Sequence, residues 1–571
     1  MILGFSGLVR ATGLFAISTA IFANPLTAAD LVILDAKVMT MAPKNSVAQA
    51  LAIDDGKIVA VGTNAEMSAF ITAKTVVYAL PGSLVLPGFQ DSHTHLIWSG
   101  TGQEDIALFD AATKDDLTRL IRDGAALRPD EPWVKGGGWD LSAFPYNTLD
   151  AAFLDELVPD RPAVFDSVDG HSTWVNTAVL KLAGITSNTP DPAGGRIERD
   201  AAGNPTGLLR EAAIALVANI TPGYSDRQVA EGLKKALAEA NAFGITSIID
   251  PKAEPWMLSG YKAALDAGLL TVRVKAAVEV LPAQGIEGVI AAVAQRDAYQ
   301  ADLLEVNAIK LFVDGVIESK TAAMLAPYVN ETFAGELLFT PEQLKAIAVA
   351  ADLQKFQLHI HAIGDRAIRA SLDAFEAAQN ANGPRDSRHQ IAHLEVIDPA
   401  DIGRFKSLGV IANFQPFWAY PDSYITDLTE PVIGPERSQW LYPIGAVLNA
   451  GGIVAAGSDW SVSSMNPLDA IQVAVTRQDP ADPNGRILTP QHKVTVEQMI
   501  AAYTINGAFA GFRETDTGTL EVGKLADIVV LDADITTIAL TDIAKTSVLM
   551  TLLAGVPVYQ SPALPAPKAP E

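Results

Sequence analysis

The sequence contains no cysteine among its 571 residues. This absence excludes thiol catalysis, thiolate metal ligands and disulfide bonds. Any metal ion must therefore be held by histidine, aspartate, glutamate or a modified lysine. Histidine is also scarce, and the chain has only eight: His93, His95, His171, His359, His361, His389, His393 and His492.

Positively charged residues are fewer than negatively charged ones. The chain has 41 lysines and arginines against 66 aspartates and glutamates, a net charge of −25. An acidic chain repels phosphate backbones, so we expect no nucleic-acid partner. Hydrophobic residues make up 49% and charged residues 19%, which excludes a disordered chain. The length exceeds one ordinary domain and indicates a large barrel with additions, or about two to four domains.

Long apolar runs are missing beyond the N-terminus, so we expect no membrane partner. Residues 1–29 read as a secretory signal peptide. Arg10 is its only charge, an apolar run from Leu14 to Ala23 follows, and small residues end it at Ala29. We therefore expect a periplasmic or secreted protein, since disulfides are optional in a periplasm. The alternative is a misassigned start codon.

Both ends of the chain look like short β-strands. Residues 31–62 contain apolar runs joined by the turn Asp54-Asp55-Gly56, which is typical of a hairpin. A second group of short strands lies between residues 518 and 558. Neither group has enough strands for a core of its own. We predict that residues 30–86 and 516–560 pair into one small β-sandwich.

Between these ends, strand-like and helix-like segments alternate. Strands are expected at residues 246–250, 308–313, 357–362, 390–394, 410–414 and 453–457, and helices at 226–243, 341–355 and 365–380. Repeated strand–helix units imply a parallel sheet, and their number favours a closed (β/α)8 TIM barrel over residues 87–515, an α/β fold.

Two segments depart from this alternation. Residues 105–235 are rich in Gly, Pro, Trp and Asp and do not keep the rhythm, so we interpret them as an insertion after the first barrel strand. Residues 561–571 are rich in proline and alanine, and we expect a disordered tail.

The first chemically suggestive motif is His93-Thr94-His95. Residues i and i+2 of a strand point to the same side, so the two imidazoles converge and suit a metal ion. The alternative is an accidental pair of surface histidines.

Lys310 lies inside the apolar run Ala308 to Val313. Burying a lysine costs several kcal/mol unless it loses its charge or finds a partner. A neutral amine is nucleophilic and can capture CO₂ as a carbamate, which would bridge two metal ions. The alternative, slightly favoured from this segment alone, is a buried lysine paired with a residue such as Asp314.

Four histidines belong to the next two predicted strands. His359 and His361 should face the barrel axis, and His361 is nearer the C-terminal strand end, where barrel active sites lie. His359 is deeper and is more often a hydrogen-bonded core residue than a ligand. His393 ends the next strand, whereas His389 begins it and is assigned a surface or structural role.

Asp459 follows the apolar strand at 453–457. Such an aspartate can bind a metal ion and accept a proton from water. Its alternative role is the N-cap of the next helix. Together these residues place His, His, Lys, His, His and Asp at the ends of separate strands, which random placement makes improbable. Nitrogen and oxygen donors in this number suit two zinc-like ions.

In chain order these motifs are LVLPGFQDSHTH, DGHSTWVN, IKLFVDGVIESKTA, HIHAIGDRA, QIAHLE, GSDWSV and GKLADIVVLD. The chain resembles the amidohydrolase superfamily, and within it the YtcJ-like (amidohydrolase 3) branch, over roughly residues 31–557. The resemblance implies a (β/α)8 barrel with a β-sandwich built from both chain ends. It also implies a hydrolase of carbon–nitrogen bonds other than peptide bonds, acting on a small-molecule substrate.

The resemblance further implies the roles of the site residues. His93 and His95 would bind the more buried metal ion, His361 and His393 the more exposed one, and Lys310 would bridge them as N6-carboxylysine. Asp459 would bind metal and act as the catalytic base. The metal would be one or two divalent ions, with zinc expected.

His171, in the DGHSTWVN motif, becomes a candidate contact to the substrate or its carbonyl, or else a hydrogen-bonded loop histidine. Trp139 and Trp460 are candidate pocket walls or plain core residues. A metal-assisted isomerase or lyase, or a non-catalytic periplasmic binding protein, are the alternative functions. The substrate and the formation of a homo-oligomer are left open.

Overall fold

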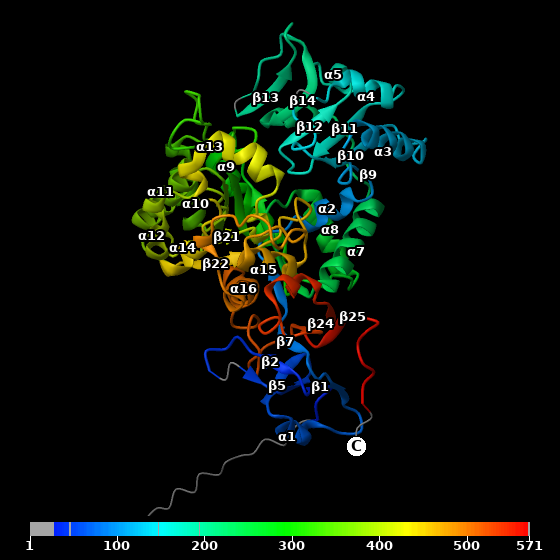
Figure 1. Ribbon diagram of the computed structural model, residues 1–571, viewed down its shortest axis with the longest axis vertical. Helices are drawn as coiled ribbons and strands as arrows, with labels where there is room; N and C mark the ends of the chain where they lie inside the picture. Colours follow the sequence, from blue (N-terminus) through cyan, green and yellow to red (C-terminus); the bar gives the residue numbers. More distant parts are fainter. Residues whose placement is uncertain (1–27, 45–46, 147, 193, 569–571) are drawn as a thin grey trace, which may run out of the picture.

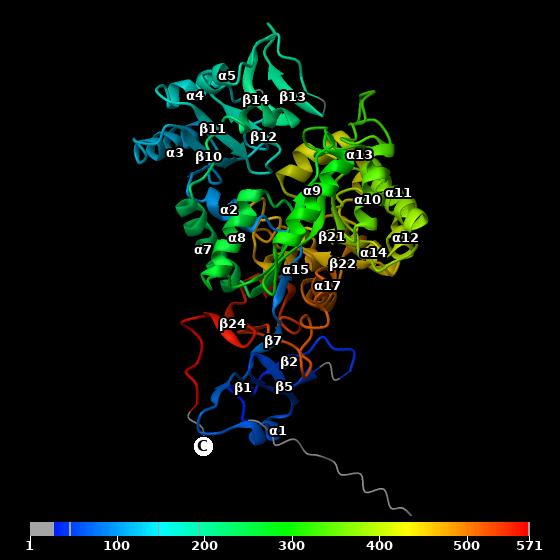
Figure 2. The same ribbon diagram turned by 180° about the vertical axis from the view of Figure 1, so that it is seen from behind.

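The computed structural model describes residues 28–44, 47–146, 148–192 and 194–568. Along its long axis lie a small β-sandwich, a barrel and an inserted sheet domain (Figure 1). The view from behind shows the same order (Figure 2). The predicted signal peptide lies outside the described residues as far as residue 27. Ala29, assigned to it, is buried and donates its N–H to the Phe70 carbonyl, so this residue belongs to the β-sandwich.

The barrel consists of eight strands that pair in chain order, every pair parallel. The strands are β8 (Phe89–Asp91), β15 (Ile245–Asp250), β16 (Arg273–Glu279), β18 (Leu304–Phe312), β19 (Gln357–Ala362), β20 (Gln390–His393), β21 (Ile411–Phe414) and β22 (Ile453–Ala456). A 2.9 Å hydrogen bond from Ser92 N to Ala456 O joins the first strand to the last. The predicted (β/α)8 barrel is therefore confirmed.

The helices of the barrel begin where their capping residues lie. Helix α10 (Pro341–Leu353) starts after Thr340, whose hydroxyl accepts the N–H of Gln343 while the Gln343 side chain accepts the N–H of Thr340. This capping box satisfies two amides that the helix leaves free. No helix within the described residues is long and apolar enough to cross a bilayer.

The β-sandwich uses both ends of the chain, as predicted. One sheet has the order β5 (Lys57–Gly62), β4 (Ala50–Asp54), β1 (Leu31–Leu34), β6 (Val76–Ala79), and the other the order β25 (Val556–Gln560), β24 (Val548–Leu553), β23 (Ile528–Leu531), β7 (Leu84–Pro87), β2 (Lys37–Met39), β3 (Val47–Ala48). Residues 561–571 were predicted to be a disordered tail, but the structure places this segment in a defined position as far as residue 568. Lys568 donates its N–H to the Val77 carbonyl, so backbone pairing holds the tail against β6.

The insertion is more regular than its sequence suggested. It forms a six-stranded sheet in the order β13 (Gly195–Arg199), β14 (Pro205–Glu211), β12 (Ser172–Val175), β11 (Ala163–Ser167), β10 (Val134–Trp139), β9 (Ile106–Ala107). It also ends earlier than residue 235, because α7 (Asp226–Ala242) begins at a capping box on Ser225 and buries one face in the barrel core.

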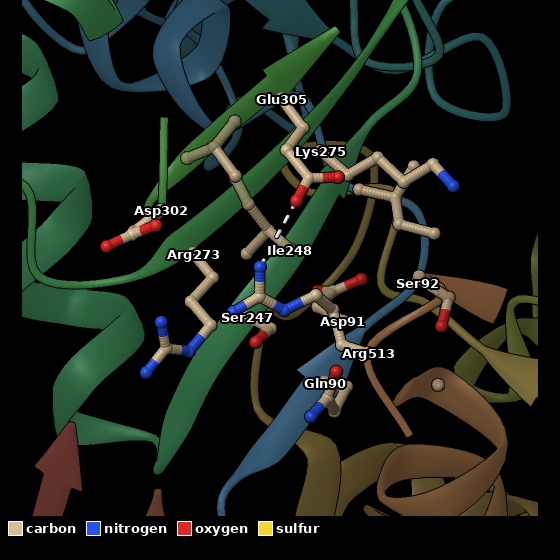
Figure 3. A pocket seen from close by; sticks show the side chains of 14 residues that line it. Gln90, Asp91, Ser92, Ser247, Ile248, Arg273, Lys275, Asp302, Glu305 and Arg513 are labelled. Atoms are coloured by element: carbon tan, nitrogen blue, oxygen red, sulfur yellow. Dashed lines mark hydrogen bonds and ion pairs between the residues drawn. The ribbon is translucent and has the colours of Figure 1, made fainter. Parts of the chain in front are cut away.

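A buried ion pair ties the barrel to the β-sandwich. Arg273, the first residue of β16, donates to Asp527 through Nε at 2.8 Å and Nη2 at 3.1 Å. Both residues are buried. Beside Arg273 lies a small cavity at the N-terminal ends of β15, β16 and β18, where Arg513 bonds Glu305 (Figure 3). None of the predicted site residues lines this cavity.

We expect Asp527→Asn to lower the free energy of unfolding by about 3–5 kcal/mol, because it leaves the Arg273 guanidinium buried without its counter-charge. Urea unfolding followed by circular dichroism measures this loss. The matched control is Asp266→Asn, which breaks the exposed Lys262–Asp266 pair on α8 (Pro255–Asp266) and should cost less than about 1 kcal/mol. Equal losses in the two variants would contradict the prediction.

Candidate metal centre

The parallel strands bring the predicted site residues to one end of the barrel. Asp459, just beyond β22, lies at the centre of the group. Its Oδ1 is 3.2 Å from His95 Nε2 and 3.4 Å from His93 Nε2. Its Oδ2 is 3.8 Å from His393 Nδ1. The structure therefore gathers residues from the first, sixth and eighth barrel strands around one carboxylate.

Several polar atoms in this group are buried without a hydrogen-bond partner in the described part of the chain. They are His93 Nε2, Lys310 Nζ, His393 Nδ1 and Asp459 Oδ1. Each such atom costs about 1–3 kcal/mol. The candidate ligand atoms of His93, His393 and Asp459 lie within 4.8 Å of one another. Nitrogen and oxygen donors left unsatisfied in this way fit a zinc-like cation.

His359 orients His93. Its Nε2 lies 2.8 Å from His93 Nδ1, so His93 keeps Nε2 for the centre of the site. Such a contact fixes the tautomer and the ring plane of a metal ligand. Burial, and then the charge of Lys310, hold the pKa of His93 well below its usual range. The imidazole is therefore neutral, the form that binds metal.

His361 lies beside His393, with ring centroids 4.5 Å apart. Its Nε2 is 3.2 Å from the Gly315 carbonyl, so the other ring nitrogen, Nδ1, is the one that could bind a metal ion. The two rings are thus neighbours, as a shared second metal ion would need, although the tightest trio of ligand atoms joins His393 to His93 and Asp459.

Lys310 is fully buried on β18, in register with Glu279 of β16 and His359 of β19. Burial lowers the pKa of its amine to about 7, against the opposing effect of Asp459. The alternative partner Asp314 does not bond it. The Asp314 carboxylate instead accepts three backbone N–H groups, from residues 323, 363 and 364. Lys310 Nζ thus has no hydrogen-bond or ion-pair partner among the described residues and lies over the Phe312 ring, 4.6 Å from its centroid.

Backbone strain marks two of the site residues. His393 has φ +76° and Asp459 has φ +54°, values that side chains larger than glycine adopt at a cost of about 1–3 kcal/mol. A side chain at Gly457 would place its Cβ 2.5 Å from His93 N, so only glycine fits there. These features hold His93, His393 and Asp459 close together.

The insertion contributes a histidine–glutamate pair to the site. His171, just before β12, has its ring centroid 5.3 Å from that of His361. His171 Nδ1 is 2.8 Å from Glu211 Oε2, at the end of β14. Burial alone would lower the pKa of His171, but the Glu211 carboxylate outweighs it and raises that pKa to about 9. Glu211 is thus the main group that favours the charged form of His171, and Asp169 and Asp459 add to its effect.

Glu211 was missed by the sequence reasoning. It ends the segment Leu208-Leu209-Arg210-Glu211, and it is about nine-tenths buried. Its other oxygen accepts the Thr321 hydroxyl at 2.7 Å, and its φ is +50°. The sequence signal that could have identified Glu211 is a charged side chain next to an apolar run. The same kind of signal identified Lys310.

The remaining candidates have structural roles. Trp139 is fully buried in the core of the insertion and donates Nε1–H to the Phe165 carbonyl, so of its two predicted alternatives it is a core residue and not a pocket wall. Trp460 is buried in the barrel core. Asp459 does not cap the next helix, because Asn466 does. His389 is buried and accepts the Leu358 N–H.

Comparison with known proteins agrees with this geometry. The model of the amidohydrolase family matches residues 76–559. The chain is 31% identical over 543 residues to the Arabidopsis thaliana protein LONG AFTER FAR-RED 3, covering 93% of this chain and 92% of that one. It is 28% identical over 544 residues to the N-substituted formamide deformylase of Arthrobacter pascens, covering 93% and 98%.

The fold matches a solved structure as well. A metal-dependent hydrolase from Pyrococcus horikoshii superposes with a TM-score of 0.71 at 22% identity, covering 89% of this chain and 99% of that one. The family predicted from the motifs is thus confirmed. The chain belongs to the amidohydrolase family and is a hydrolase of carbon–nitrogen bonds other than peptide bonds.

Proposed function

We propose that this enzyme hydrolyses an amide-type bond in a small molecule, an N-acyl, formamide or cyclic amide, with one or two divalent metal ions, zinc by preference. The observation that carries this proposal is the group of buried, unpartnered donor atoms around Asp459. The formamide deformylase named above supports the class of substrate.

The residues that would hold the ions are His93, His95, Lys310, His361, His393 and Asp459. When bound, the ions supply Lewis acidity and lower the pKa of a water to about 7. Asp459 holds the carboxylate that accepts a proton from the attacking water and returns it to the leaving nitrogen. His171, held by Glu211, supplies an N–H for the substrate carbonyl oxygen.

We propose that Lys310 is N6-carboxylated. Its neutral amine would attack CO₂, forming an N–C bond and releasing one proton, so that an unpartnered amine becomes an anionic oxygen ligand. Full burial and the absence of an ion pair at Nζ among the described residues support this step. Carbon-13 NMR of protein reconstituted in ¹³C-labelled bicarbonate should show a carbamate resonance that disappears in Lys310→Met.

The hydrolysis is tested with metal-loaded protein and a panel of formamides, acetamides and cyclic amides in ¹⁸O-labelled water. We expect turnover that a chelator abolishes, with the label in the carboxylate product. Product without solvent oxygen would favour the isomerase or lyase alternative. Failure to cleave any amide or ester would overturn the proposal. Ligand binding that is undiminished after removal of the metal would favour a non-catalytic binding protein.

We expect Glu211→Gln to lower kcat/KM by about 10–100-fold, mainly through kcat, since the glutamine cannot support a charged His171. Steady-state kinetics and metal analysis would measure this. Metal content should stay unchanged, because Glu211 contacts His171 and Thr321 rather than the proposed ligands. Glu211→Asp should recover part of kcat. A loss confined to metal content would contradict the role of Glu211 as a positioning residue.

We also propose that the protein works in the periplasm or outside the cell, from the character of residues 1–29. N-terminal sequencing of protein purified from the periplasmic or culture fraction should begin at Ala29 or shortly before it, since Ala29 is buried in the β-sandwich. Retention of the full chain in the cytoplasm would overturn this.

A further inference from the structure

A group of six carboxylates lies near His171 and the segment after His393. They come from the insertion, from the loops after β18, β20 and β21, and from the segment after α15 (Pro467–Thr476): Asp140, Asp169, Glu318, Glu395, Asp422 and Asp479. Each raises the pKa of another member or of a tyrosine among them. Across the described ranges, none of the six forms an ion pair with lysine, arginine or histidine within 4.0 Å.

The carboxylate deepest in this group is Glu395, two residues after His393. It is only 5% exposed. Tyr442 donates its N–H to the Glu395 backbone carbonyl at 2.8 Å, but the side-chain oxygen Oε2 has no hydrogen-bond partner in the described structure. Its strongest charged neighbour is Glu318, itself bonded by the Thr429 hydroxyl at 2.7 Å. A buried carboxylate oxygen facing another carboxylate lacks a cationic partner.

Aromatic rings complete this side of the site. Trp418 lies parallel to the His393 ring, with centroids 5.5 Å apart, and is partly exposed. Tyr420 and Tyr424 are also partly exposed, and Asp422 lies between them in the chain. Aromatic faces attract ammonium and guanidinium groups. The rings and the carboxylates therefore favour the same kind of ligand.

The positively charged side chains in this neighbourhood, His171 and Lys252, already have acidic partners. His171, which acts on Glu318, is bonded to Glu211. Lys252 lies after β15 at 4.0 Å from Glu279. Burial, together with Glu318 and two other acidic neighbours, raises the pKa of Asp422 to about 7. Burial is the largest cause of this shift, and a cation would offset the part that comes from the neighbouring carboxylates.

We propose that these carboxylates and rings form a subsite for a positively charged group, an ammonium or guanidinium, carried by the substrate near its scissile bond. The inference rests on the proposed amide hydrolysis and narrows its substrate class. Glu318 and Asp422 are its specificity-determining residues, since both are partly exposed and neither is a proposed metal ligand.

The test uses three acetamides of similar length: those of butane-1,4-diamine (charge +1), pentylamine (0) and 4-aminobutyrate (−1). With metal-loaded enzyme at pH 7.5 and low salt, we expect kcat/KM for the cation to exceed the neutral amide at least tenfold, and the anion to be poorest. Added salt should shrink this advantage. Equal or better use of the neutral amide overturns the subsite while amide hydrolysis stands.

If no amide is cleaved, the proposed hydrolysis fails, and calorimetric titration with the same three compounds decides the subsite separately. Tighter binding of the cation by at least tenfold supports it, and equal affinities overturn it. This binding measurement keeps the two failures distinguishable.

Glu318→Gln and Asp422→Asn should each reduce the cation-to-neutral ratio at least threefold, with kcat/KM for the neutral amide within about twofold of wild type, which also shows that the variants fold. Asp302→Asn is the control. It makes the same change in net charge at the opposite end of the barrel (Figure 3) and should leave the ratio unchanged. An unchanged ratio in both subsite variants, or an equal change in the control, overturns the assignment.

Discussion

Asp459→Asn is expected to lower kcat by about 10³-fold or more while most of the metal stays bound. Asparagine has nearly the shape of aspartate and keeps one oxygen toward the histidines. It carries no charge, however, and cannot accept a proton from water. A loss of this size corresponds to about 4 kcal/mol in the activation barrier.

The measurement combines single-turnover kinetics with metal analysis of the purified variant. Asp527→Asn serves as the control for instability, because it weakens the barrel–sandwich junction, far from the histidines, and should keep its turnover per folded molecule. Turnover within tenfold of wild type in metal-loaded Asp459→Asn would remove this residue as the base.

Lys310→Met is expected to abolish measurable turnover and to lower the metal content of the protein. Methionine is similar in length and apolar, so it fits the buried channel that Lys310 occupies between β16 and β19. The metal-free variant should be as stable as metal-free wild type, or more stable by about 1–3 kcal/mol, since the unpartnered amine is gone. Activity and apo-protein stability should thus change in opposite directions.

Lys275→Met provides the matched control. Lys275 is buried on the same barrel, and burial lowers the pKa of its amine to about 7 as well. Its Nζ, however, lies 3.4 Å from the Ala510 carbonyl at the other end of the barrel. This variant should keep both metal and turnover. Full activity in Lys310→Met would exclude a ligand role for Lys310.

The elements that sequence predicts well are those whose signal is local. The strand at 357–362 coincides with β19 because alternating histidines and apolar residues set its two faces. Helix α10 begins at the expected cap because Thr340 and Gln343 lie three residues apart. Strand-end histidines could be placed together because parallel strands share one C-terminal edge.

What sequence did not reveal depends on contacts between distant residues. The partner of His171 is 40 positions away, and only the pairing of β12 with β14 brings Glu211 to it. The strands of the insertion are short and interrupted by glycine, so their sequences do not show the alternation of apolar and polar residues that predicts a strand. For Trp139, the choice between a pocket wall and a core residue stayed open, because composition does not distinguish an inner face of the insertion from one that faces the site.

The pairing of β7 with β23 affects how the chain can fold during its synthesis. Strand β7 leads through one glycine into β8 and thus to His93, yet its antiparallel neighbour is Ile528–Leu531. At a synthesis rate of about 5–20 residues per second, the ribosome needs tens of seconds to deliver that neighbour. During this interval the strand that leads to His93 and His95 has an open edge. We therefore expect nascent chains to depend on chaperones, or on delayed folding, until the last residues emerge.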